Sequence, residues 1–218
     1  SEALAIARDS DAAVGVARSF LKDGRIAEAA RLCEELLDAE PKNCDALYTL
    51  AVARRLQKRF DEALALTRDL ITLDPANGRA HQEMGHCLRD MGDVQGALAA
   101  YQEAVARNNA LLGSWQMLER LHAQAGREVP ADFASAQVEY LSSLPPQLLT
   151  VASLIQEGKM YKAEQLCRHF LQTQGHHVEG MRFLAKIGMS FNVQDEAEFL
   201  LESAVVLDPD NIGAILIM

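Results

Sequence analysis

Histidine and cysteine are the residue types in this 218-residue chain that could bind a metal ion or act as a nucleophile. Their densest group is Cys167, His169 and the adjacent pair His176-His177. A zinc site prefers ligands four residues apart on a helix or a Cys-x-x-Cys pair, and neither spacing occurs in this group. His86 and Cys87 are neighbours, so their side chains would point in different directions on a helix. We therefore predict no metal, no cofactor and no catalytic residues.

The four cysteines predict free thiols rather than disulfides. The chain has four scattered cysteines and no Cys-x-x-Cys pair: Cys33, Cys44, Cys87 and Cys167. Such residues usually pack as small apolar side chains in a reducing compartment, so we expect a cytoplasmic protein. A Cys–His nucleophilic pair would also need a strained nucleophile turn and an oxyanion loop. The glycines supply neither, because they recur at a fixed interval.

Several glycines and alanines of this chain recur at an interval of 34 residues, which indicates the repeating elements that would position any site. A turn residue recurs every 34 residues at Gly24, Lys58, Gly92 and Gly126. An alanine does the same at Ala29, Ala63, Ala97 and Ala131. After a slip of two residues the pattern resumes at Gly158 and Asn192, and at Ala163 and Ala197. Pro41, Pro75 and Pro209 share another phase, at which a helix should end.

The repeat predicts helix–turn–helix units with apolar residues at helical spacing. In the first unit we expect helices over residues 10–22 and 26–39. The fourth unit is two residues short and degenerate, with its second helix expected over 131–143 after Val129-Pro130. We treat residues 1–218 as one array with units at 10–43, 44–77, 78–111, 112–143, 144–177 and 178–211, followed by the start of a further helix at 212–218.

This period and residue pattern resemble the tetratricopeptide repeat (TPR) superfamily over residues 10–211. The resemblance implies an all-α fold, a right-handed superhelical solenoid whose first helices line a concave groove. It also implies a protein that binds a partner protein or an extended peptide in that groove. The TPR pocket for chaperone C-termini uses Lys and Asn at positions that are Val14 and Arg18 here, so that docking is disfavoured.

A narrower resemblance concerns bacterial proteins that join TPRs to a C-terminal sulfotransferase domain. It is carried by the strings at 144–149, 154–158, 163–168 and 197–202. It implies that this chain presents substrate to a catalytic domain beyond Met218. A third alternative is self-assembly into a homo-oligomer, because Leu216, Ile217 and Met218 make the chain end on apolar residues where a terminal repeat normally has a polar face.

The predicted groove is richer in basic residues than the rest of the chain. Its first-helix faces carry eight basic residues: Arg18, Lys22, Arg55, Arg79, Arg89, Arg120, Arg182 and Lys186. They carry four acidic residues: Asp11, Asp45, Asp90 and Glu179. The helix dipole explains part of this distribution, because it favours acids at helix starts and bases near helix ends. A functional explanation is that arginines bind the carboxylates of an acidic segment or a free C-terminus.

The predicted peptide-binding residues combine these bases with polar, aromatic and aliphatic neighbours. They are Arg18, Tyr48, Val52, Arg55, Arg79, Gln82, His86, Arg89, Gln116, Arg120, Arg182 and Lys186. Trp115 falls at a position that buries a large side chain, so we expect it in the core. The net charge of −10 argues against nucleic acid as a ligand. No apolar run approaches the length of about 20 residues that spans a bilayer, so no membrane partner is expected.

Overall fold

The computed structural model describes residues 2–208, with side chains described from residue 10 onward. These residues form twelve α-helices and no strand, which confirms the all-α fold class of helix–turn–helix repeats. The first six helices are α1 (Glu2–Lys22), α2 (Ile26–Ala39), α3 (Cys44–Leu56), α4 (Phe60–Leu73), α5 (Gly78–Met91) and α6 (Val94–Arg107). The others are α7 (Leu112–Gln124), α8 (Glu128–Ser143), α9 (Pro146–Gln156), α10 (Met160–Thr173), α11 (Val178–Ser190) and α12 (Gln194–Leu207). Pro209, Leu216, Ile217, Met218 and the helix start predicted at 212–218 lie outside the described residues.

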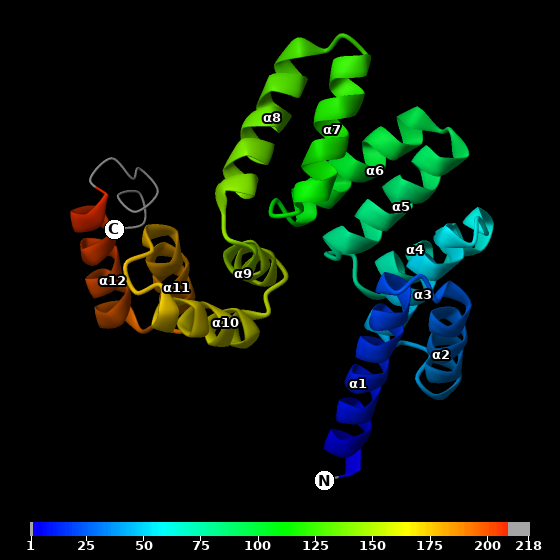
Figure 1. The fold of residues 1–218 in the computed structure, drawn as a ribbon, viewed down its shortest axis with the longest axis horizontal. Helices are drawn as coiled ribbons and strands as arrows, with labels where there is room; N and C mark the ends of the chain where they lie inside the picture. The colour runs from blue at the N-terminus through cyan, green and yellow to red at the C-terminus, as the bar shows by residue number, and fades with distance from the viewer. Residues whose placement is uncertain (1, 209–218) are drawn as a thin grey trace. The chain divides into compact units, whose positions relative to one another are not determined.

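The described chain, whose helices are labelled in Figure 1, divides into two compact units by its internal contacts. Unit 1 comprises residues 2–107 and 120–127, and unit 2 comprises residues 108–119 and 128–208. In unit 1 the helices pack as the pairs α1–α2, α3–α4 and α5–α6, and each pair contacts the next one along the chain. In unit 2 the pairs α9–α10 and α11–α12 pack in the same way. A single array running through both units stays a prediction.

The turn inside each helix pair needs a residue in the left-handed region. Gly24, Gly92, Gly126 and Gly158 all have positive φ angles, as the repeat phase predicts. Lys58 and Asn192 occupy the same phase without glycine, and both have φ of 61°. A side chain in this conformation costs about 1–2 kcal/mol, and asparagine tolerates it better than lysine. The repeat therefore imposes its turn geometry on whichever residue stands there.

Several first helices begin with a side chain that caps the helix. Asn43 accepts a hydrogen bond from the backbone N–H of Ala46 at 3.0 Å, and Asn77 accepts one from Ala80 at 3.1 Å. In the same repeat phase, His177 Nδ1 accepts one from the N–H of Gly180 at 3.4 Å. Such caps satisfy backbone donors that the helix leaves unpaired. His177 is thus a loop histidine, as expected, and its ring has a structural role.

Small residues let the paired helices approach closely. Ala29, Ala63, Ala97 and Ala163 are fully buried, as the repeat pattern predicts, whereas Ala131 at the same phase of the degenerate repeat is only half-buried. Gly85 of α5 lies against Tyr101 of α6, and a Cβ atom at position 85 would stand 2.7 Å from Tyr101 Cε1. The helix contact therefore has no room for a methyl group at that point.

Three of the four cysteines are buried, and none of the four forms a disulfide. Burial raises the pKa of Cys33 to about 11 and the pKa values of Cys87 and Cys167 to about 12. Cys44 is only half-buried, at the start of α3, where its thiol faces the Lys42 carbonyl at 3.6 Å. The prediction of packed free thiols is therefore right for Cys33, Cys87 and Cys167.

Two helices depart from the expected bounds. In the first repeat α1 begins at Glu2 and not at residue 10. In the fourth repeat the difference is smaller. Its second helix, α8, starts at Glu128 and not at 131, so Pro130 lies in the first turn, where its missing N–H costs nothing. Trp115 of α7 is buried as predicted, and its indole N–H donates to the carbonyl of Asn109 at 2.9 Å. The Trp115 ring meets the edge of Phe133 with centroids 5.7 Å apart. No helix among the described residues is both long enough and apolar enough to cross a membrane.

Candidate binding face and pocket

The first helices of each unit lie against one another and form one face. In unit 1, α3 contacts both α1 and α5 directly, and in unit 2, α9 contacts α11. Consecutive first helices therefore present their side chains together, which is the arrangement that the predicted groove requires. We call these two surfaces the first-helix faces of unit 1 and unit 2.

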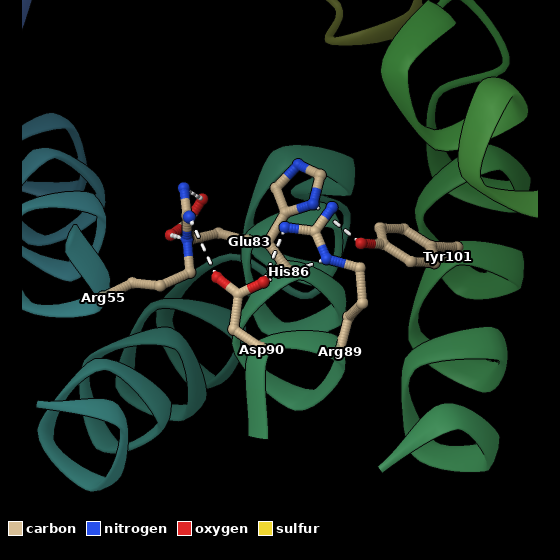
Figure 2. A network of polar contacts seen from close by, with 6 residues as sticks. All are labelled: Arg55, Glu83, His86, Arg89, Asp90 and Tyr101. Atoms are coloured by element: carbon tan, nitrogen blue, oxygen red, sulfur yellow. Dashed lines mark hydrogen bonds and ion pairs between the residues drawn. The ribbon is translucent and has the colours of Figure 1, made fainter. Parts of the chain in front are cut away.

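Ion pairs join adjacent helices across the first-helix face of unit 1 (Figure 2). Arg55 of α3 donates from Nε to Glu83 of α5 at 2.5 Å and from Nη1 to Asp90 at 3.3 Å. Arg89 donates from Nη2 to the other oxygen of Asp90 at 2.6 Å. Farther along the face, Arg18 of α1 pairs with Asp45 of α3. These contacts hold the arginines in defined positions on the face.

Glu83 is the residue of this cluster that sequence reasoning missed. It is only 2% exposed, and burial raises the pKa of its carboxyl group, while Arg55 opposes that shift. With Glu83 included, the Arg55–Glu83–Asp90–Arg89 cluster has two cations and two anions. The first-helix face of unit 1 is therefore closer to charge balance at this cluster than the sequence count indicates.

His86 and Tyr101 form a second polar contact beside this cluster (Figure 2). His86 Nδ1 and the Tyr101 hydroxyl oxygen are 2.7 Å apart, and the two rings meet edge to face with centroids 5.3 Å apart. Burial, reinforced by Arg55 and Arg89, lowers the pKa of His86 to about 4. Burial also raises the pKa of Tyr101 to about 12. At neutral pH both groups are uncharged, so the contact is a hydrogen bond between neutral partners.

The remaining residues predicted for the unit 1 groove have mixed environments. Tyr48 and Val52 of α3 are half-buried, and Tyr48 packs beside Leu47 in a core cluster. Burial raises the pKa of Tyr48, with a further contribution from Glu83. Arg79 and Gln82 of α5 are also half-buried. On α7, Gln116 and Arg120 are exposed, and Gln116 belongs to unit 2 while Arg120 belongs to unit 1.

In unit 2, Arg182 and Lys186 lie one turn apart on α11. The Arg182 guanidinium contacts the Glu179 carboxylate and donates from Nη2 to the hydroxyl of Tyr140 at 2.6 Å. The Tyr140 hydroxyl in turn donates to Glu179 at 3.0 Å. Lys186 is exposed and makes no ion pair within the part of the chain that the structure describes.

A pocket of about 160 Å³ opens beside these two cations. Its lining comes from α8, α9, α11 and the Asn109-Ala110 turn, all of which belong to unit 2. Tyr140 and Gln137 of α8 are pocket residues that the sequence did not indicate. They lie on the second helix of the degenerate repeat, where the pattern gives no groove positions. The pocket thus combines two predicted residues with a helix that the prediction left out.

Comparisons with known proteins agree with a helical-repeat array. The family described as "Anaphase-promoting complex, cyclosome, subunit 3" matches residues 3–104. The general transcriptional corepressor trfA of Dictyostelium discoideum is 31% identical over 72 residues, which is 33% of this chain. That match spans only 5% of the length of the corepressor.

Solved structures support the fold over nearly the whole chain. The pilF protein of Pseudomonas aeruginosa superposes with a TM-score of 0.58 and 18% identity, covering 98% of each chain. The APC/C hetero-tetramer Cut9-Hcn1 superposes with a TM-score of 0.57 and 13% identity, covering 94% of this chain and 41% of that one. Naa15/Naa10 bound to HypK-THB superposes with a TM-score of 0.56 and 17% identity. The superposition covers 95% of this chain and 33% of that one. At these identities the likeness concerns the fold alone.

Proposed function

We propose that this chain, whose repeats resemble those of the tetratricopeptide-repeat superfamily, is a protein-binding module whose first-helix faces hold an extended polypeptide segment. The observation that carries the proposal is the set of ordered arginines on the first-helix face of unit 1. Arg18, Arg55 and Arg89 are each held by an acidic residue, and the first two pairs cross from one helix to the next.

An arginine held in this way is suited to binding. Each guanidinium has five N–H donors in a fixed plane, so a carboxylate contact leaves donors for a ligand. A side chain that is already ordered loses less conformational entropy when a partner binds. Backbone carbonyls and carboxylates of an extended segment are matching acceptors. Two structural neighbours are themselves parts of assemblies, Cut9 with Hcn1 and Naa15/Naa10 with HypK-THB, which supports a protein partner here.

The proposal predicts that reversing charge on the face weakens binding without unfolding the protein. Arg89 and Arg120 suit this test because both are accessible, whereas Arg55 is held by the buried Glu83. We expect the wild-type chain to enrich a common sequence pattern from a displayed random-peptide library. The double variant Arg89→Glu, Arg120→Glu should weaken binding of those peptides by at least roughly tenfold, because two attractive charges become repulsive.

A matched control makes the same change of net charge elsewhere. Arg31 of α2 and Arg68 of α4 are exposed residues of second helices, so Arg31→Glu, Arg68→Glu should leave peptide binding unchanged. Circular dichroism and the thermal midpoint check the fold of each variant, and Arg89→Gln, Arg120→Gln serves if the glutamates unfold unit 1. Equal affinity of the wild-type chain and the face variant would refute the proposal, as would failure of the wild-type chain to select any pattern.

A further inference from the structure

The pocket of unit 2 has an unusual charge lining. Arg182 and Lys186 both line it, and no acidic residue is among the described residues that do so. Glu179 pairs with Arg182 from three residues earlier on α11. The charges of Arg182, Lys186 and Glu179 sum to one net positive charge beside the pocket. An occupant with a single negative charge would balance it.

One hydrogen-bond donor of Arg182 is buried without an acceptor. The Nε atom has no hydrogen-bond partner, although Nη2 of the same guanidinium contacts both Glu179 and Tyr140. A buried donor left without an acceptor costs about 1–3 kcal/mol, so proteins seldom leave one in place. Because this N–H group is shielded from solvent, an oxygen atom of an occupant would reach it only if the Arg182 side chain shifted.

The rest of the lining shows what else the occupant carries. Leu141, Ile155 and Phe183 supply apolar surface, which fits a short aliphatic stem. Gln137 and Gln156 supply amide groups that can bond a peptide backbone. A volume of about 160 Å³ is the space of a few water molecules and suits one side chain rather than a large ligand.

We propose that this pocket binds one carboxylate of a partner polypeptide, with Arg182 and Lys186 contacting the charge and the apolar wall holding the stem. The inference rests on the proposed function, because it identifies the chemistry by which a bound segment is anchored in unit 2. A carboxylate carries one charge and two acceptor oxygens, which matches the single net positive charge and the N–H donors that Arg182 and Lys186 bring to the lining. A phosphate carries nearly two charges and would meet added repulsion from Glu179.

Small probes test the pocket without a known partner. We would titrate the full 218-residue chain with butyrate at low ionic strength and follow the side-chain N–H resonance of Arg182 by NMR. Butyrate should shift this resonance saturably, whereas butyramide, an uncharged molecule of the same shape, should not. Inorganic phosphate should bind more weakly than butyrate. A butyramide shift equal to that of butyrate, tighter binding of phosphate, or no saturable shift would each overturn the proposal.

Lys186 offers a variant that leaves the fold intact, because its side chain is exposed. Lys186→Met should weaken butyrate binding by at least roughly fivefold, since it removes one of the two contacting charges. Lys162→Met removes an exposed lysine from α10, away from the pocket lining, and should leave butyrate binding unchanged. Equal weakening by both variants would show that only general electrostatics is at work and would reject the pocket.

Peptides from the library selection distinguish the source of the carboxylate and separate the two proposals. Amidation of the peptide C-terminus weakens binding if the anchor is a terminal carboxylate, and replacement of an internal glutamate by glutamine does so if it is a side chain. Peptide selection without butyrate binding would reject the pocket and leave the proposed function standing. Butyrate binding without any selected peptide would reject the proposed function and leave a carboxylate site.

Discussion

The polar residues of the unit 1 face differ in how deeply each is buried, and this sets their chemistry. Glu83 and Arg55 form an ion pair with little access to water, and removing one partner of such a pair typically costs 3–5 kcal/mol. Arg89 and Asp90 are more exposed, and an exposed ion pair contributes at most about 1 kcal/mol. The first pair therefore joins α3 to α5 in a poorly solvated contact, while the second is closer to solvent.

His86 should make folding sensitive to acid. Its pKa is about 4 in the folded chain because of burial, below the ordinary value of 6.5, so the unfolded chain binds a proton that the folded chain rejects. The contribution of neutral His86 to the stability of the folded chain is fully present above pH 6.5 and is lost as the pH falls toward 4. Between pH 7.5 and pH 5 we expect His86 to lower the free energy of unfolding by about 2 kcal/mol.

Urea unfolding of the wild-type chain and of His86→Gln at both pH values measures this contribution. The glutamine variant cannot gain a proton, so its stability should fall less on acidification. His81 and His122 also have pKa values lowered by burial, but they remain in both proteins and cancel in the comparison. Identical pH dependence of the two proteins would show that His86 is protonated as readily in the folded chain as in water.

At the scale of the helices, the close approach of two paired helices depends on small residues at their contact. Gly85→Ala should destabilise the chain by about 1–3 kcal/mol, because the new methyl group would overlap the Tyr101 ring. Gly15→Ala is the matched control, because a Cβ atom at Gly15 of α1 meets nothing within 4 Å. That change should stabilise the chain by about 0.5–1 kcal/mol, since alanine favours the helix. Thermal or urea unfolding checks both signs, and a stabilising Gly85→Ala would contradict the observed packing.

The elements could be predicted more fully than the site. The bounds of α2 and the left-handed turns at Lys58 and Asn192 follow from the repeat phase alone, because stacking fixes the same geometry in every unit. Glu83 could not be recognised as a groove acid, because its role depends on Arg55 from the preceding unit. Tyr140 could not be placed either. Its contact with Arg182 spans 42 residues and depends on how the shortened repeat packs.

At the scale of the whole chain, a repeat array should respond locally to damage. Each helix pair contacts mainly its neighbours, so stability is roughly a sum over units and interfaces. We expect Gly85→Ala to accelerate amide hydrogen exchange in α5 and α6, with little change in α9–α12. Mass spectrometry of deuterated peptic fragments measures both regions at once. Uniform acceleration along the chain would instead indicate one cooperative folding unit.

The sulfotransferase likeness, the self-association and the continuous array remain predictions at this scale. The match to the curated corepressor covers 5% of that protein, and its function does not transfer to this chain. Sedimentation at several concentrations tests self-association, because a monomer sediments independently of concentration. Peptide binding by the 218-residue chain alone would show that the module recognises its partner without an attached enzyme domain.

The three buried thiols give this chain its own set of chemical reporters. Cys33 lies in α2, Cys87 in α5 and Cys167 in α10, so each belongs to a different helix pair. With pKa values of about 11 to 12, these thiols carry almost no thiolate at neutral pH and should ignore alkylating reagents while the pairs stay closed. The order in which they become labelled would therefore record the order in which the pairs open, without any introduced dye.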